Sequence, residues 1–392
     1  MRRISALLPI FYIAVSTGLF AQQLPDQFFG MNVLHATYKT PWPAVKIGSL
    51  RLWDSDETSW ANIEKRPGDF NFDGLDHWLQ LAKSHHAEVL FTFGRVPAWA
   101  NGNRHQSVPP NDLKQWDEFV RSLVRHANGR ISSYELWNEP NMKNFWSGDL
   151  PTLVSMAERA YHIIKAEQPN AIVTTPSPTW SDSSSPSQWF EQYFAAGGGN
   201  YADVIAFHGY LGTVPEPFVR EMEKIRAVAK KYGLERKPIW DTEFSWGTDN
   251  KLTDPDAQAS FLARSYILHV SQGVHRLYWY AWDGSDGKTI FTDGTWGTLW
   301  DQSGERRPAK ALRTVTRWLS GAKLPLLCTT QATVWECQLN GADLLVWDSS
   351  TEHSYQPKNH FSRYRDLNDQ IHTITGGGQI PIGASPIHLE AR

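Results

Sequence analysis

The sequence predicts an α/β fold, namely a (β/α)8 TIM barrel at residues 22–320 followed by a small β-sandwich-like domain at 321–392. Between about residue 28 and residue 320, short runs rich in β-branched and aromatic residues alternate with segments of helical period, which is typical of such a barrel. No Gly-x-Gly-x-x-Gly motif follows the first run, which disfavours a doubly wound open sheet. After residue 320 the helical segments stop, and Asn-Gly and Gly-rich turns join short alternating strands.

Eight strands are expected in the barrel, and helices separate most of them. The strands are predicted at residues 28–35, 49–54, 88–94, 133–139, 171–178, 203–210, 238–246 and 276–282. Helices are predicted at residues 73–86, 111–129, 215–233, 254–273 and 307–320, where apolar residues recur at helical spacing. Asn111 or Asp112 can cap the second helix, and Asp254 can cap the fourth. The connection at 36–48 is interrupted by proline and predicts a weak helix, and the serine-rich residues 177–189 are interpreted as the loop after the fifth strand.

The N-terminus matches the pattern of a secretory signal peptide at residues 1–21. Arg2 and Arg3 precede an apolar run that ends at Phe20, and Ala21 offers a small residue for cleavage. A membrane anchor is the alternative, which a proline and two polar residues inside the run disfavour. We therefore expect a secreted or periplasmic protein with no membrane association after signal cleavage.

Composition narrows the class of ligand. The formal net charge of the 392-residue chain is −3, which gives no reason to expect binding to nucleic acid or to an anionic membrane. The chain has 19 Trp, more than a core usually needs, and aromatic faces pack well against sugar rings. The two cysteines, Cys328 and Cys337, are close enough in sequence to pair across neighbouring strands of an exported protein, but the sequence leaves this disulfide open.

Polar side chains gather where the predicted strands end, which is where reactive groups lie in a barrel. These positions carry Arg51, Asp54, Asn138, Glu139, His208, Tyr210, Glu243, Trp279 and Trp282. Glu139 ends the fourth strand and Glu243 ends the seventh, so the two can face each other across the barrel mouth. Cleavage of a glycosidic bond requires two such carboxyl groups, one to donate a proton and one to attack the anomeric carbon or activate water.

The neighbouring residues divide the two roles. Arg51 and Tyr210 are expected to lower the pKa of Glu243, by charge and by hydrogen bonding. The negative charge of Glu243 is expected to raise the pKa of Glu139. Glu139 is therefore the predicted acid/base and Glu243 the predicted nucleophile.

The segments "LWNEPN", "FHGY" and "WDTEFSW", in this order, resemble the retaining glycoside hydrolases of clan A. The resemblance implies Glu139 as acid/base, Glu243 as nucleophile and Asn138 as a ligand of the sugar 2-hydroxyl. It also matches Arg51 to the arginine that ends strand two and His208 and Tyr210 to the His-x-Tyr of strand six. The segment "YWYAWD" and the small β-domain resemble family 39, which implies Trp279, or Trp282 in its place, under the sugar.

The resemblance implies a glycosidase that cleaves O-glycosidic bonds of an oligo- or polysaccharide by double displacement, with no cofactor and no metal. The candidate substrate contacts are Asn138, Arg51, His208, Tyr210, Trp279, Trp282, Trp99 and His35, and further loop residues at Trp53, Trp146, Trp180 and Trp246 are candidate sugar platforms. The segment "FGRVPAWAN" lacks the His or Asn that some clan members carry there, so the sugar stays open. The anomeric configuration, endo or exo action and the oligomeric state stay open as well.

Three other functions are compatible with parts of the sequence. A carbohydrate-binding protein on a hydrolase-derived barrel suits the aromatic surplus, but binding alone needs neither glutamate. A metal-dependent hydrolase has only His35 and His208 placed for it, and a Schiff-base aldolase lacks a lysine at a strand end. Glu135 is interpreted as a buried partner of a cation, and Asp241 as a supporting hydrogen-bond acceptor within the barrel.

Overall fold

The computed structural model describes residues 23–181, 183–210, 212–247, 252–284, 295–358, 361–375 and 378–391. The predicted signal peptide at residues 1–21 lies outside these ranges. Within them, no helix combines the length and the apolar character that a membrane crossing demands.

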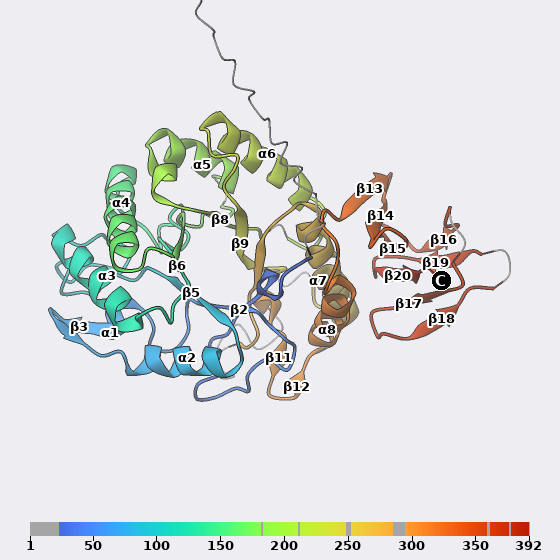
Figure 1. Cartoon of the computed structure of the whole chain (residues 1–392), viewed down its shortest axis with the longest axis horizontal. Helices are drawn as coiled ribbons and strands as arrows, with labels where there is room; N and C mark the ends of the chain where they lie inside the picture. The colour runs from blue at the N-terminus through green and yellow to red at the C-terminus, as the bar shows by residue number, and fades with distance from the viewer. Residues whose placement is uncertain are drawn as a thin grey trace, which may run out of the picture.

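Eight parallel strands form the barrel, and each lies within one of the predicted ranges (Figure 1). In barrel order they are β1 (Phe29–Asn32), β2 (Ser49–Leu52), β5 (Glu88–Thr92), β6 (Ser133–Glu135), β7 (Ile172–Thr174), β8 (Ile205–His208), β9 (Ile239–Phe244) and β10 (Arg276–Trp279). Parallel pairing runs from β7 through β1 to β8, and a bridge between Thr174 and Val204 joins the two ends of the sheet. The predicted (β/α)8 barrel is confirmed.

Helices surround the barrel. They are α1 (Trp60–Ile63), α2 (Asp73–Ser84), α3 (Leu113–Ala127), α4 (Leu150–Glu167), α5 (Pro186–Ala195), α6 (Phe218–Lys231), α7 (Pro255–Ser271) and α8 (Arg307–Leu319), with short 3-10 turns at Asp26–Phe28, Gly198–Tyr201 and Thr295–Gly297. Two hairpins are added by β3 (Glu64–Arg66) with β4 (Asp69–Phe70) and by β11 (Trp300–Asp301) with β12 (Gly304–Glu305). The expected caps are present, because Asp112 accepts a hydrogen bond from the Lys114 amide and Asp254 accepts one from the Ala257 amide.

Three helices, the short α1 and the longer α4 and α5, have no counterpart among the predicted elements. The start of α5 lies inside the serine-rich stretch that predicts a loop. Ser185 and Gln188 form a reciprocal capping box there, and Pro186 occupies the first turn. The serine that suggests a loop is therefore the residue that starts the helix.

Apolar side chains fill the end of the barrel opposite the site. Leu90, Val204, Trp240 and Tyr278 are buried together between the strands, and the Arg276 guanidinium lies 4.3 Å from the centroid of Trp240. Any side chain at Gly30 would meet this layer, since a Cβ there would lie 2.6 Å from the ring of Tyr278. This layer fills the barrel beneath the polar residues at its mouth.

The predicted small β-domain follows α8. A six-stranded antiparallel sheet contains, in spatial order, β13 (Leu327–Gln331), β14 (Val334–Leu339), β15 (Asp343–Asp348), β20 (Ile387–Glu390), β17 (Arg363–Arg365) and β18 (Ile371–Thr373). A ribbon of β16 (His353–Tyr355) and β19 (Ile380–Ile382) packs on it through a separate apolar cluster. Cys328 and Cys337 are joined by a disulfide between β13 and β14, which answers the question left open by the sequence.

The β-domain lies beside α7 and α8 (Figure 1). Side chains alternate along β15, so that Leu345 and Trp347 join the barrel's core while Val346 faces the ribbon. The indole nitrogen of Trp347 donates a 3.0 Å hydrogen bond to Glu216, which precedes α6, and Arg264 of α7 donates a 2.6 Å hydrogen bond to the same oxygen. The hydrogen bond from Trp347 to this ion pair of the barrel therefore links the two parts.

Candidate active site

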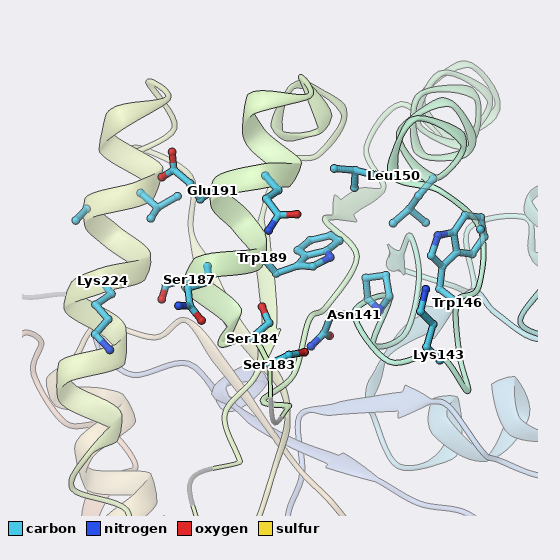
Figure 2. A pocket seen from close by; sticks show the side chains of 17 residues that line it. Asn141, Lys143, Trp146, Leu150, Ser183, Ser184, Ser187, Trp189, Glu191 and Lys224 are labelled. Atoms are coloured by element: carbon cyan, nitrogen blue, oxygen red, sulfur yellow. The ribbon is translucent and has the colours of Figure 1, made fainter.

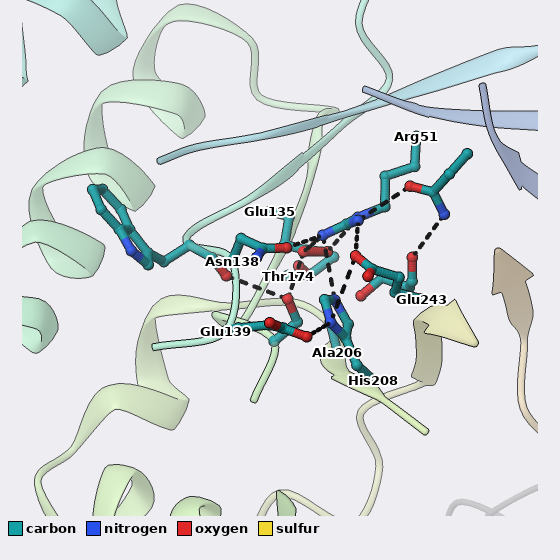
Figure 3. A network of polar contacts seen from close by, with 12 residues as sticks. Arg51, Glu135, Asn138, Glu139, Thr174, Ala206, His208 and Glu243 are labelled. Atoms are coloured by element: carbon teal, nitrogen blue, oxygen red, sulfur yellow. Dashed lines mark hydrogen bonds and ion pairs between the residues drawn. The ribbon is translucent and has the colours of Figure 1, made fainter. Parts of the chain in front are cut away.

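Arg51 lies at the centre of a buried polar network at the mouth of the barrel (Figure 3). Its Nη1 donates to Glu243 Oε2 at 2.7 Å and to Asn32 Oδ1 at 3.1 Å. Its Nη2 donates to Glu135 Oε1 at 2.9 Å and to Asn138 Oδ1 at 2.7 Å. One rigid guanidinium thus fixes four side chains, which come from β1, from β6 and the residues just after it, and from β9, as the fork geometry of arginine allows. Glu135 is the buried partner of a cation that the sequence suggests.

Glu243 points into the barrel because β9 contains a β-bulge. Phe207 and His208 of β8 are consecutive, yet they pair with Asp241 and Glu243 of β9, so β9 has one extra residue at Thr242. Asp241 points outward and contacts His269 of α7 at 3.0 Å, whereas Glu243 points inward. Asp241 is thus a hydrogen-bond acceptor, as predicted, but it lies on the outer face of the strand. The alternation of side chains along a strand predicts one face for Asp241 and Glu243, and the bulge breaks that alternation.

Glu139 follows β6 with a left-handed backbone conformation, at a φ of 41°. Its amide donates a 3.0 Å hydrogen bond to the Ser177 carbonyl, which continues the pairing of the chain with the neighbouring strand. Left-handed backbone is strained for a residue with a side chain and persists only where surrounding contacts enforce it. The strain brings the carboxyl group to within 2.9 Å of His208 Nδ1.

His208 connects the two glutamates and Arg51. Arg51 Nη2 lies 3.3 Å from His208 Nε2, and because a guanidinium only donates, Nε2 must be the accepting nitrogen. The proton of the neutral ring is then on Nδ1, where it can be donated to Glu139. Burial, reinforced by the charge of Arg51, holds the pKa of His208 well below its ordinary value, so the ring is neutral.

The two glutamates differ in their protonation. Burial raises the pKa of Glu139 well above its ordinary value, and the negative charge of Glu243 adds to the shift. Burial also raises the pKa of Glu243, but Arg51 and the hydrogen bond from Tyr210 act against it. Arg51 and Tyr210 therefore lower the pKa of Glu243 as expected, but the loss of solvation on burial raises that pKa by more. Glu139 has the larger shift and is the residue that holds the proton.

The two carboxyl groups are close to each other. One oxygen of Glu139, one oxygen of Glu243 and a ring nitrogen of His208 all lie within 4.8 Å of one another. The carboxyl separation is about 5–5.5 Å in retaining glycosidases and about 6.5–9.5 Å in inverting ones, and nearest atoms within 4.8 Å are compatible with the closer spacing.

The same three side chains offer donor atoms to a cation, but their surroundings do not suit one. Arg51 already donates to Glu243 and to His208 Nε2, so a fixed positive charge lies against two of the three groups. The nearer nitrogen of His208 carries the proton, whereas a metal requires a free lone pair. The donor set fits an acid/base pair better than a metal centre.

The two amide and hydroxyl groups nearest the carboxyl pair differ in their hydrogen bonding. Asn138 Nδ2 is buried and has no hydrogen-bond partner in the described part of the chain, while its Oδ1 is held by Arg51. Tyr210 donates a 2.7 Å hydrogen bond from its hydroxyl group to Glu243 Oε1. A buried donor without a partner costs free energy unless a ligand satisfies it, so Asn138 Nδ2 is oriented for a hydroxyl group of a substrate.

The structure does not bring every predicted contact to this network. Trp279 is fully buried behind β10, where its indole donates to the Gly297 carbonyl and its ring packs against Tyr266 of α7. Trp282 is buried as well and donates to the Pro41 carbonyl.

Trp99 and His35 lie at the periphery. Trp99 donates to the Glu64 carbonyl beside α1, and His35 pairs with Asp56 at 2.9 Å. Among the other candidate platforms, Trp53, Trp146 and Trp246 are buried and Trp180 is partly exposed.

Tyr280 takes the place expected for Trp279. Side chains alternate along β10, with Tyr278 inside the barrel and Trp279 outside, so Tyr280 again points inward. Tyr280 packs in one small apolar cluster with Tyr210, the hydrogen-bond donor to Glu243, and the charges of Glu243 and Glu139 add to the burial that raises the pKa of Tyr280. Trp296 packs edge-on against both Tyr280 and Tyr210. The period of two along "RLYWY" was the signal that could have identified Tyr280 from the sequence.

The rim beside β2 and β5 is built from charged groups. Tyr280 donates a 3.3 Å hydrogen bond to Asp54, Asp54 forms an ion pair with Arg95, and the Arg95 guanidinium lies 5.0 Å from the centroid of Trp53. Asp54 and Arg95 both have left-handed backbone, with φ values of 55° and 57°. Trp53 therefore supports Arg95 and is not a free sugar platform.

Comparison with known sequences shows the family of the chain. A family model described as glycosyl hydrolase catalytic core matches residues 76–310, which is more than half of the chain. A β-xylosidase from Geobacillus stearothermophilus is 21% identical over 231 residues, and one from Caldicellulosiruptor saccharolyticus is 25% identical over 230 residues. Each match covers 50% of this chain and 45% of the relative, so the chain spans less than half of the length of these relatives.

Solved structures share the fold over nearly the whole chain. A family 39 glycoside hydrolase from Bacteroides cellulosilyticus has a TM-score of 0.74 at 16% identity and covers 94% of this chain and 82% of its own. A monomeric β-xylosidase from Caulobacter crescentus has a TM-score of 0.63 at 13% identity and covers 94% of this chain and 97% of its own. The likeness to the family 39 enzymes of clan A, inferred from the sequence motifs, is confirmed.

Proposed function

Because the chain belongs to the glycosyl hydrolase catalytic core family, we propose that it is a retaining glycosidase with Glu139 as acid/base and Glu243 as nucleophile. The observation that carries the proposal is the close approach of the two buried carboxyl groups, whose nearest atoms lie within 4.8 Å. Nearest atoms this close fit the spacing of retaining enzymes, about 5–5.5 Å, better than the wider spacing of about 6.5–9.5 Å that admits the water of an inverting reaction.

In the first step, an oxygen of Glu243 forms a bond to the anomeric carbon while the bond to the leaving oxygen breaks and Glu139 donates its proton to that oxygen. In the second step, Glu139 takes a proton from water, the water oxygen bonds to the anomeric carbon, and the bond to Glu243 breaks. Atoms and protons balance, since Glu139 ends protonated and Glu243 ends ionised. No cofactor enters either step.

The surrounding residues prepare both groups for these roles. Arg51 and Tyr210 stabilise the ionised Glu243, while burial and the charge of Glu243 raise the pKa of Glu139 and so favour its protonated form. Asn138 Nδ2 is the donor available to the sugar 2-hydroxyl, because Arg51 fixes the other end of that amide. Tyr280, with Trp296 packed against its edge, supplies the aromatic surface beside the reacting carbon.

The assignment is tested with Glu139→Gln and Glu243→Gln, assayed on a panel of aryl glycosides. β-Xylosides and β-glucosides come first in the panel because relatives with this fold are named as β-xylosidases and a glucosidase. Each change should reduce kcat by about 10²–10⁴-fold. The exposed Glu118 of α3, replaced as Glu118→Gln, is the matched control and should keep wild-type rates.

Proton NMR of the first product formed distinguishes the two stereochemical outcomes, and retention is expected. Azide should restore turnover to Glu139→Ala, because a small anion can resolve the glycosyl-enzyme without general base catalysis. Wild-type rates in both Gln variants, or a product of inverted configuration, would contradict the assignment. Loss of activity with a chelator would favour metal-dependent hydrolysis instead.

We also propose that the enzyme is exported and acts on an oligo- or polysaccharide outside the cytoplasm. The support is the charged and apolar pattern of residues 1–21. N-terminal sequencing of the protein recovered from the culture medium or periplasm should give a chain that starts close after Ala21. A chain that retains Met1 in the cell membrane would show that the segment is an anchor.

A further inference from the structure

A cavity of about 870 Å³ lies next to the site, on the side of Glu139. It is formed by the loops that follow β6 and β7 and by the facing sides of α4, α5 and α6 (Figure 2). Its volume is at the upper end of the range for small-molecule pockets, about 300–1,000 Å³. The cavity begins at Pro140, directly after the proposed proton donor, and extends to Val228 of α6.

The lining combines hydrogen-bonding groups with apolar edges. Side-chain amides and hydroxyl groups come from Asn141, Ser183, Ser184, Gln188 and Gln192. Leu150 and Trp189 add apolar surface, although most of Trp189 is buried. Hydroxyl groups need partners that both donate and accept, which amides and serines provide, and the C–H faces of a sugar pack against apolar surface.

Charged groups around the cavity are largely paired within the protein. Glu191 forms an ion pair with Lys231 and accepts a 2.7 Å hydrogen bond from Tyr232. Lys224 lies 3.4 Å from Glu221 of the same helix. This pairing gives little reason to expect a strongly charged partner and favours a neutral, hydroxyl-rich one.

Asn141 and Thr179 connect the lining of the cavity to Glu139. Asn141 Nδ2 donates to the Thr179 carbonyl at 2.7 Å, and the Thr179 amide donates to Asn141 Oδ1 at 3.0 Å. The Thr179 side chain also hydrogen-bonds Glu139 and lowers its pKa in part. Asn141 therefore faces the cavity on one side and supports the proton donor on the other.

We propose that this cavity binds the leaving-group end of an oligosaccharide chain whose scissile bond lies at Glu139. The inference rests on the proposed function, because a proton donor must contact the leaving oxygen and therefore marks the side on which the leaving group lies. The cavity begins on that side. A single small leaving group ends at Glu139, whereas a chain of several sugars continues into the cavity. The substrate class is therefore an extended oligo- or polysaccharide.

The test compares an aryl glycoside that the enzyme cleaves with oligosaccharides of the same sugar, two to six units long. For the wild type, kcat/KM should rise with chain length as further units enter the cavity. Gln192→Trp places a large side chain at the exposed face of α5 and should reduce the ratio of kcat/KM for the longest chain to that for the aryl glycoside by at least about tenfold.

Gln80→Trp is the matched control, because Gln80 is an exposed glutamine on α2, away from the cavity. It should leave the chain-length dependence unchanged. Equal ratios for Gln192→Trp and Gln80→Trp, or no dependence on chain length in the wild type, would overturn the inference while leaving the glycosidase assignment in place. Failure of the wild type to cleave any aryl glycoside or oligosaccharide would instead overturn the proposed function and the inference with it.

Discussion

Arg51 and Glu243 form a buried ion pair, with Nη1 2.7 Å from Oε2 and exposed side-chain fractions of 0% and 8%. The same guanidinium contacts Glu135 through Nη2 and Nε, so one positive charge is shared between two carboxylates. A buried guanidinium in this position stabilises the ionised form of Glu243. It also orients the Glu243 carboxylate, because the planar fork of arginine has a fixed geometry.

Arg51→Lys should reduce kcat/KM by about 100-fold although the charge is kept. A lysine ammonium cannot reach Glu135, Asn138 and Glu243 together, so the nucleophile loses its orientation. Steady-state kinetics on an aryl glycoside measure the change. Arg125→Lys on the exposed side of α3 is the control. Near wild-type activity in Arg51→Lys would show that charge alone is sufficient.

Tyr210→Phe should move the acid limb of the kcat/KM profile to higher pH. The tyrosine hydroxyl donates to Glu243 and so stabilises its ionised form. Without that hydrogen bond the pKa of Glu243 rises, and the nucleophile becomes protonated at a higher pH. The pH dependence of kcat/KM, measured for both proteins at the same ionic strength, gives the shift. An acid limb that stays in place would assign that limb to another group.

Glu139→Gln should be more stable than the wild type at neutral pH and no more stable at acidic pH. Burial and the charge of Glu243 raise the pKa of Glu139 in the folded protein above its unfolded value. Stability is therefore lost as pH rises between those two values, since the unfolded chain releases the proton first. The neutral amide introduced by Glu139→Gln avoids this loss, so the free energy of unfolding of the variant at neutral pH should exceed that of the wild type by about 1 kcal/mol. Thermal unfolding from pH 4 to pH 8 measures the difference, and a gain independent of pH would contradict its origin.

Tyr280 and Trp279 should respond to substitution in opposite ways. Tyr280→Ala removes the ring beside the catalytic pair and should lower kcat/KM by at least about tenfold. Trp279→Phe removes a hydrogen bond and volume from the layer behind β10, so it should cost about 1–3 kcal/mol of stability. Its kcat/KM should remain close to that of the wild type. Kinetics below both melting temperatures, together with urea unfolding, separate these effects.

Glu216→Gln should destabilise the barrel at the place where it contacts the β-domain. It leaves the Arg264 charge buried without its partner, at a cost of about 3–5 kcal/mol, while the amide can still accept from Trp347. The double variant Glu216→Gln/Arg264→Met should regain most of the loss, because no charge is then left unpaired. Chemical denaturation of the three proteins is the measurement. Equal stabilities of the single and double variants would contradict this account.

The barrel and the main catalytic candidates could be predicted from the sequence because both depend on local pattern. The C-terminal ends of parallel strands meet at one edge, so Arg51, Glu139, His208 and Glu243 had to lie near each other once their strands were identified. The roles of these residues remain proposals, but their proximity is a consequence of the fold.

Features that depend on tertiary structure could not be predicted in this way. The bulge in β9 is invisible in the sequence and reverses the expected relation between Asp241 and Glu243. The depth of burial at Glu243 was also unknown, and it outweighs the pKa effects of Arg51 and Tyr210. The choice between Trp279 and Tyr280 is different, since strict alternation from Tyr278 would have decided it.

The apolar layer of Leu90, Val204, Trp240 and Tyr278 closes one end of the barrel beneath the site. In the proposed reaction, substrate, departing sugar and incoming water must then exchange through the opposite mouth. The water that resolves the glycosyl-enzyme can reach Glu139 only after the first product has left the space above it. The closed end of the barrel thus requires the leaving group to depart before water enters. Slow departure of a long leaving group would favour its transfer back onto the enzyme-bound sugar over hydrolysis.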